Sequence, residues 1–217
     1  MNSPRLSRRE LAFVVGVPAA WGVLLLFHPQ GDTTDFFPVI RDSVGAWQAV
    51  HIGMAVFVPL FAGAIYLLLR GIEGMAARVS RIGIAVFAVF YAAWELVLGV
   101  GTGILAADVN ALPGPEQAAG AALVESYAES TILFVFSAIG SVALGVGMIG
   151  AVVALRGAYE LGWVSIVLMV LSIPLVAIHE PPFGPIGLGM FIVAVVILVR
   201  HRVSAPAPAV PVGPTPA

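Results

Sequence analysis

Six long apolar runs constrain this chain more than any other feature of its sequence. They lie at 10–27, 47–69, 82–107, 129–155, 161–178 and 183–199. At about 1.5 Å per residue, a helix of such length crosses a hydrocarbon layer about 30 Å thick. With 60% hydrophobic and 10% charged residues and a mean hydropathy of +1.04, the 217 residues carry more apolar surface than a water-soluble fold can bury. The sequence therefore predicts an integral membrane protein.

These runs indicate helices rather than the strands of a membrane barrel. They are continuous and rich in Leu, Ala, Val and Gly, whereas barrel strands are short segments of alternating hydrophobicity. We expect an all-α polytopic bundle of six transmembrane helices, which forms a single domain over residues 1–203. The segment 204–217 is rich in Pro and Ala, and we expect it to be a disordered cytoplasmic tail.

The arginines predict how the six helices are oriented. The chain has no lysine, and only Arg41 among its 10 basic residues lies on the side of the first connection. Cytoplasmic loops of membrane proteins accumulate basic residues, so both termini are expected in the cytoplasm and the protein in the cell membrane. The arginines on the expected cytoplasmic side are Arg5, Arg8, Arg9, Arg70, Arg78, Arg81, Arg156, Arg200 and Arg202.

Small residues in the third and fourth runs predict close helix packing. Gly99 and Gly103 are four residues apart, as are Ser141 and Gly145. This spacing lets helix backbones approach each other in lipid. We expect these pairs to form contacts inside the bundle, and an oligomer formed through the same glycine-rich runs is left open.

Histidines and carboxylates gather toward the expected outer face. His28, His51 and His179 each lie near the outer end of a different run, so they are expected at a similar depth. Imidazole and carboxylate groups suit zinc or another divalent transition metal. No HxxxH or HExxH spacing supports such a site, and the alternative is a set of hydrogen-bonded interfacial side chains. The candidate metal ligands are His28, His51, His179, Glu129 and Glu180.

Glu95 is the acid that lies within a predicted span. An acidic or basic group at such a position costs about 2.5 to 3.5 kcal/mol on insertion scales, and it faces the bundle interior in most proteins. Tyr91, Trp94 and Thr102 share its helical face and could donate hydrogen bonds to it. Glu95 is therefore an intramembrane ionisable group, which either carries protons or is a structural, hydrogen-bonded acid.

The connection between the third and fourth runs is long enough to shape the outer surface. Pro113-Gly114-Pro115 ends the third run, and the residues up to Glu129 fit a short outer helix. Glu125 and Glu129 are four residues apart on that helix, where like charges repel weakly. Arg41 is the only arginine on this side, so we expect it to be the counter-ion of the outer acids. Trp47, at the outer end of the second run, is expected to be an interfacial anchor.

Two short strings near the N-terminus carry a resemblance to a known family. They are His28-Pro29-Gln30-Gly31-Asp32, which closes the first run, and Trp47-Gln48-Ala49-Val50-His51, which opens the second. The pattern resembles an uncharacterised family of multi-spanning bacterial and archaeal membrane proteins with no assigned activity. The resemblance covers about the first 70 residues. It implies a membrane protein and draws attention to His28, Asp32 and His51, but it supplies no catalytic residue.

Three classes of function are compatible with the sequence. The first is a small solute or ion transporter or binding protein, with Glu95 inside it and the outer polar residues at its mouth. The second is a metal-dependent membrane enzyme, or a haem- or metal-binding subunit, that uses the outer histidines. The third is a non-catalytic structural or partner-binding membrane protein. No catalytic residue is identified, which favours a protein that is not an enzyme.

The expected partners follow from the same composition. The lipid bilayer surrounds the apolar runs, while a net charge of -2 and dispersed arginines disfavour nucleic acid. The sequence does not specify which solute or protein partner is bound.

Overall fold

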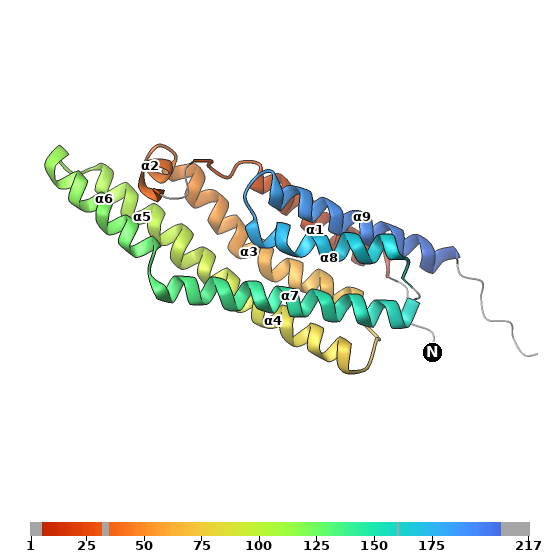
Figure 1. Cartoon of the computed structure of the whole chain (residues 1–217). Helices are drawn as coiled ribbons and strands as arrows, with labels where there is room; N and C mark the ends of the chain where they lie inside the picture. The colour runs from red at the N-terminus through yellow and green to blue at the C-terminus, as the bar shows by residue number, and fades with distance from the viewer. Residues whose placement is uncertain (1–5, 32–34, 160, 205–217) are drawn as a thin grey trace, which may run out of the picture.

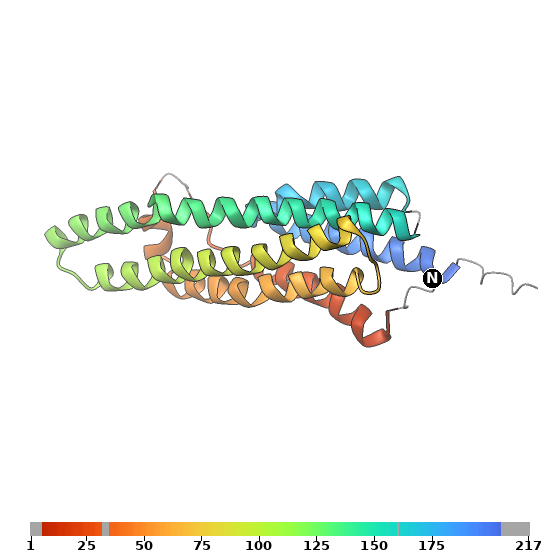
Figure 2. The same cartoon turned by 90° about the horizontal axis from the view of Figure 1, so that it is seen from below.

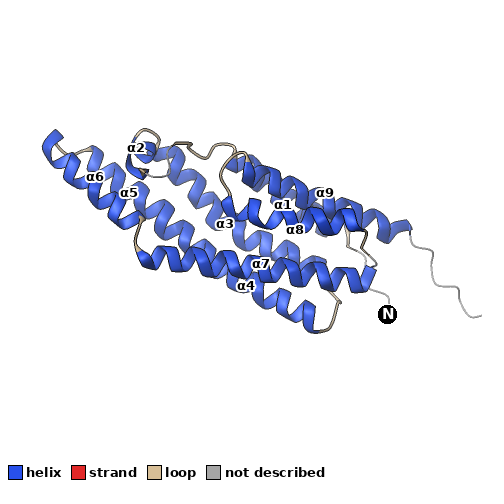
Figure 3. Ribbon diagram, in the orientation of Figure 1, coloured by secondary structure: helices blue, strands red, loops and turns tan. Residues whose placement is uncertain are grey.

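The structure, a computed structural model, describes residues 6–31, 35–159 and 161–204 (Figure 1). Within these ranges every regular element is a helix and none is a strand (Figure 3), so the all-α prediction is confirmed. The helices are α1 (Arg8–Leu25), α2 (Phe36–Arg41), α3 (Val44–Leu68), α4 (Met75–Trp94), the π-helix η1 (Glu95–Val100), α5 (Gly101–Asn110), α6 (Gly114–Ala128), α7 (Thr131–Tyr159), α8 (Trp163–Ile178) and α9 (Phe183–Ser204).

Four helical stretches are long and apolar enough to cross a membrane, which supports the prediction of a membrane protein. The remaining helices that run along the bundle are α1 and α8. Helix α8 is apolar but has 16 residues, and α1 has 18 residues with three charged side chains in its first turn. The four stretches are Val44–Leu68, Met75–Asn110, Gly114–Tyr159 and Phe183–Arg200.

The long helices run side by side along one axis, and the chain turns at two ends of the bundle (Figures 1 and 2). One end, which we call the arginine end, holds the start of α1, the end of α9 and the connections α3–α4 and α7–α8. The opposite end holds α2 and the α5–α6 connection, and there α5 and α6 project beyond the other helices. The arginines of the arginine end are Arg8, Arg9, Arg70, Arg78, Arg81, Arg156 and Arg200.

Glycines bring α4 and α7 into close contact. A Cβ atom added to Gly83 would lie 2.7 Å from the backbone nitrogen of Gly147, so neither position has room for a side chain. The Ser80 hydroxyl donates a hydrogen bond to the carbonyl of Gly147, 2.6 Å away, and fastens the same crossing. The expected Ser141 and Gly145 pair is not the closest contact, because a Cβ atom added to Gly145 would have its nearest neighbour, Cγ2 of Ile173, at 4.0 Å.

The projecting helices form a small second core with α2. Its buried side chains include Phe37 and Ile40 of α2, Val109 of α5 and Val124 of α6. The helix predicted between Pro113 and Glu129 is confirmed as α6, which begins at Gly114 and ends at Ala128. Glu125 on α6 accepts backbone hydrogen bonds from the first turn of α2, so a carboxylate caps that helix where its dipole favours negative charge.

Candidate metal centre

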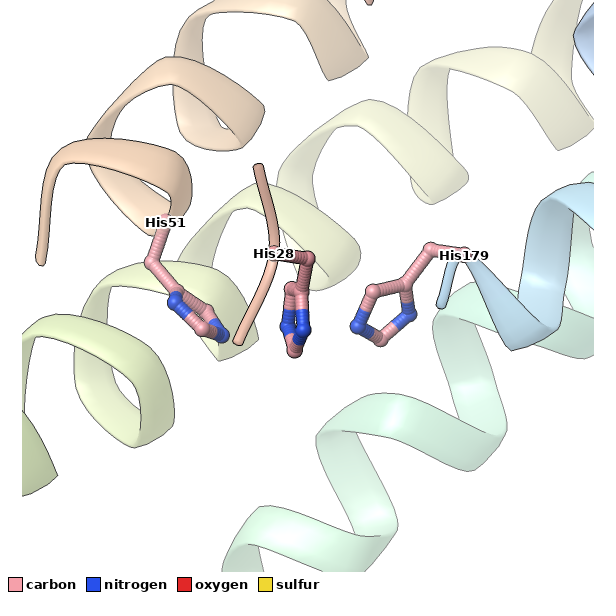
Figure 4. Close-up of side chains that lie close together, drawn as sticks. All are labelled: His28, His51 and His179. Atoms are coloured by element: carbon pink, nitrogen blue, oxygen red, sulfur yellow. The ribbon is translucent and has the colours of Figure 1, made fainter. Parts of the chain in front are cut away.

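Three histidines from three separate parts of the chain meet in one place. His28 lies just beyond the end of α1, His51 lies near the start of α3, and His179 caps the end of α8. Each offers one imidazole nitrogen, and these three nitrogens lie within 4.8 Å of one another. Figure 4 shows the rings turned toward one another, with His28 between the other two. The chain therefore assembles a three-imidazole cluster from elements distant in sequence.

The cluster is closely packed and shielded from solvent. The ring centroids of His28 and His51 are 5.1 Å apart, and those of His28 and His179 are 5.4 Å apart. The three side chains keep only 5%, 3% and 7% of their surface exposed for His28, His51 and His179, respectively. Such burial is uncommon for interfacial polar residues, which keep a polar end in water.

Hydrogen bonds orient two of the rings by the same means. The Nδ1 atom of His28 lies 2.8 Å from the carbonyl oxygen of Pro29, and that of His51 lies 2.7 Å from the carbonyl oxygen of Trp47. A carbonyl only accepts, so each Nδ1 must carry the proton. Each Nε2 then presents a lone pair, as in metal-binding histidines whose other nitrogen is held by an oxygen.

The third ring is fixed through a tyrosine. The Tyr91 hydroxyl donates to the carbonyl of Ala177, 2.9 Å away, and lies 3.0 Å from Nδ1 of His179. Because its one proton is already donated, the hydroxyl accepts from His179. His179 is thus protonated on Nδ1, so in the neutral form of all three imidazoles the Nε2 atom carries the lone pair that can bind a metal ion.

A tight turn sets the position of His179. Its backbone has a φ of 49°, in the left-handed region that non-glycine residues seldom adopt. Gly184, at the start of α9, packs against the carbonyl of His179, where a side chain would collide with the backbone. Helix α9 begins at Phe183, so the turn that follows His179 is shorter than the proline-rich string 179–185 suggests.

The π-helix η1 supplies the surface against which His51 packs. A Cβ atom on Gly99 would collide with the His51 ring, so only glycine fits there. The Gly99 carbonyl accepts a hydrogen bond from the Trp47 indole nitrogen, 2.6 Å away. Single π-helical turns are common at functional sites, because they widen the helix and reposition side chains. Here the π-helix carries Gly99 and Glu95 to the same histidine.

Glu95 lies beside the cluster with no hydrogen bond of its own. Its carboxylate oxygen Oε2 is 3.9 Å from Nε2 of His51, and only 1% of the residue is exposed. Both of its oxygens lack a partner among the described residues. The expected donors Tyr91 and Thr102 were the wrong choice, since both hydroxyls donate to backbone carbonyls instead.

The other predicted residues lie in different surroundings. Glu180 lines a small cavity together with His28, whereas Glu129 is exposed after the end of α6 and is not part of the three-histidine group. Arg41 pairs with its neighbour Asp42 at 2.7 Å, so its partner is not Glu125 or Glu129. This guanidinium lowers the pKa of the Asp42 carboxyl below its ordinary value through a hydrogen bond. Asp32 lies outside the described residues.

The roles predicted from the sequence for Trp47 and Tyr91 are wrong, because both residues contact the histidine cluster. Trp47 is not an interfacial anchor, because it is buried, bonded to η1 and packed at 4.3 Å between centroids on the His51 ring. Tyr91, predicted as a hydrogen-bond donor to Glu95, instead bonds to Nδ1 of His179. Trp47 and His51 are four residues apart on one helix, and this spacing is the sequence signal that could have predicted the contact between them.

The three histidines are packed too closely to hold a large cofactor between them. The cavity beside His28 and Trp47 has a volume of about 20 Å³. A space of that size holds about one water molecule, whereas a haem requires a broad slot between its axial ligands. The histidine rings, 5.1 to 5.4 Å apart between centroids, leave no such slot. The donor set of imidazoles with a nearby carboxylate matches zinc or a similar divalent ion.

Comparisons with protein-family models, curated proteins and solved structures found no match for this chain. The function proposed below therefore rests on the arrangement of His28, His51 and His179.

Proposed function

We propose that this chain is a metal-binding protein of the cell membrane, which holds a divalent transition metal ion through His28, His51 and His179. The observation that carries the proposal is the arrangement of three buried imidazoles, whose Nδ1 atoms all bond to an oxygen. That arrangement leaves each ring with the lone pair a metal needs. Zinc is the ion whose ligand preference matches it best.

The proposal includes six membrane crossings with both termini in the cytoplasm. Helices α1 and α8 add two crossings to the four apolar stretches, because both pack lengthwise in the bundle: α1 against α3 and α9, and α8 against α9. The basic residues gather at the arginine end, which corresponds to the cytoplasmic face by the positive-inside rule. The histidine cluster then lies toward the outer face, since His28 and His179 follow helices that start at the arginine end.

Metal binding accounts for the site better than transport of a larger solute. The three histidine side chains are buried and their rings are packed with centroids 5.1 to 5.4 Å apart, which leaves little room for a solute to pass between them. A single ion needs no larger space. The third class, a purely structural protein, gives no reason to bury three imidazoles with their lone pairs turned to one point.

Elemental analysis of the purified protein tests the proposal. The full chain, solubilised in detergent and supplied with zinc, is compared with His51→Ala and His179→Ala by plasma mass spectrometry. His201→Ala is the matched control, because His201 is the histidine in the last turn of α9, at the arginine end. We expect about one zinc ion per chain in the wild type and the control, and loss of the ion in both site variants. Equal zinc content in all four proteins would refute the proposal.

A further inference from the structure

The Glu95 carboxylate is a fully buried acidic group that lies beside His51 of the histidine cluster, and nothing in the described part of the chain donates a hydrogen bond to it. Both oxygens are buried and lack a hydrogen bond. Removing a charged group from water costs several kcal/mol unless a partner of opposite charge compensates it. A carboxylate that is ionised at this place therefore requires a bound cation, since the described part of the chain offers no partner of opposite charge.

The donor groups of Thr102, Trp47 and Tyr91 are already engaged with backbone carbonyls. The Thr102 hydroxyl bonds to the carbonyls of Leu98 and Gly99, and the Trp47 indole also donates to Gly99. Tyr91 donates to Ala177. The described arginines are far along the bundle at the arginine end, except Arg41, which pairs with Asp42. No fixed positive side chain is thus placed to neutralise Glu95.

The distance to His51 matches two ligands of one ion better than a hydrogen bond. Oε2 of Glu95 and Nε2 of His51 are 3.9 Å apart, beyond the range of about 2.7 to 3.2 Å for a hydrogen bond. Two ligands at about 2.0 to 2.2 Å from a tetrahedral zinc ion lie about 3.3 to 3.6 Å from each other. A shift of a few tenths of an ångström would bring the pair to that spacing. The Nε2 atom of His28 is also buried without a partner, and the ligand nitrogen of His28 lies within 4.8 Å of those of His51 and His179.

We propose that Glu95 is the fourth protein ligand of the ion held by the three histidines; this inference rests on the metal-binding function proposed above. Three neutral imidazoles leave a divalent ion with its full charge in a buried place, and the carboxylate halves that charge. The π-helix makes the arrangement: Glu95 approaches the Nε2 edge of His51 while Gly99 contacts its ring. Four protein ligands close the coordination shell, as in sites that hold an ion rather than expose it to a substrate.

Cobalt(II) is a suitable probe, because its visible spectrum reports the ligands bound to it. The detergent-solubilised full chain is titrated with Co²⁺ as wild type, Glu95→Gln and His51→Ala, with Glu129→Gln as the matched control, because Glu129 is exposed and lies outside the three-histidine group. We expect Glu95→Gln to bind Co²⁺ at least about tenfold more weakly and with shifted d–d bands. The control variant should keep the wild-type spectrum and an affinity within about twofold of the wild type.

Each contrary result has a distinct meaning. If Glu95→Gln keeps the wild-type affinity, or binds more weakly with an unchanged spectrum, Glu95 is not a ligand, while loss of binding in His51→Ala would still support the three-histidine centre. A wild type that binds no Co²⁺ would overturn both proposals. Should Glu95→Gln fail to fold, Glu95→Asp serves in its place: it keeps the charge but shortens the reach, so an unchanged spectrum and affinity would contradict the proposal.

Discussion

The hydroxyl of Tyr91 and Nδ1 of His179 lie 3.0 Å apart, and this contact ties α4 to the end of α8 at the three-histidine cluster. The same hydroxyl donates to the carbonyl of Ala177, so one tyrosine sets both the turn and the protonation of the histidine. Tyr91 touches no candidate ion itself. It is therefore a positioning residue, which fixes the ring of His179 as an oxygen partner commonly fixes a metal-binding histidine.

Replacing Tyr91 with phenylalanine should weaken metal binding. Loss of the oxygen that orients such a histidine lowers metal affinity by about 10- to 100-fold in metalloproteins. Competition with a chelator of known zinc affinity measures the change. Tyr127→Phe is the matched control, because the Tyr127 hydroxyl bonds to the carbonyl of Val97 and is no partner of a histidine. Equal weakening in both variants would show a general effect of losing a hydroxyl.

Gly99→Ala should displace His51 without removing any polar group. The new methyl group would collide with the His51 ring, which cannot withdraw because it is packed on Trp47. We expect the variant to lose stoichiometric zinc while it remains folded. The control is Gly16→Ala in α1, where nothing lies within 4 Å of an added Cβ. The zinc content of both variants is measured by mass spectrometry. Full zinc occupancy in Gly99→Ala would contradict the close packing of Gly99 against His51.

Gly83→Ala should destabilise the α4–α7 crossing. An added Cβ would lie 2.7 Å from the backbone of Gly147, so the helices must separate. Overpacking of this kind costs about 1 to 3 kcal/mol. Thermal denaturation in detergent should show a lower Tm than for Gly145→Ala, whose added Cβ has its nearest neighbour at 4.0 Å. A Tm for Gly83→Ala equal to that of the control would mean that the two helices are not in close contact.

Reporter fusions test the six-span topology. We expect a fusion at Gly74, between α3 and α4, to report the cytoplasm, and fusions at Gly114 and Pro182 to report the outside. Alkaline phosphatase is active only outside and green fluorescent protein fluoresces inside, so the pair of reporters gives opposite signals. An outside signal at Gly74 would reverse the orientation and place the metal centre toward the cytoplasm.

The helical class could be predicted from the sequence because hydropathy acts locally. A run such as 47–69 is apolar throughout, and in lipid a helix satisfies its backbone without help from other segments. The outer helix at Gly114–Ala128 was also predictable, since Pro113 and Pro115 mark its start. The π-helix at Glu95–Val100 was not, because it adds one residue to a turn without any local signal in an apolar sequence.

The site could be predicted only in part. Depth along the helices placed His28, His51 and His179 at one level, because each lies near the end of a run. The position of a residue along a helix does not show in which direction its side chain points. The surroundings of Glu95 and the exposure of Glu129 therefore could not be predicted from the sequence. Arg41 is predicted from its charge alone to pair with acids far away in the sequence. It pairs instead with the adjacent Asp42, because an ion pair between neighbours does not require a loop to become ordered.

X-ray absorption at the zinc edge of the purified, zinc-loaded protein tests whether the three histidines bind the ion. The spectrum reports the number, type and distance of the atoms bound to the ion. We expect three imidazole nitrogens at about 2.0 to 2.1 Å, visible through the multiple scattering of their rings, and one oxygen at a similar distance. A shell of oxygens without imidazole scattering would contradict this expectation, because the ion would then lie away from the three histidines.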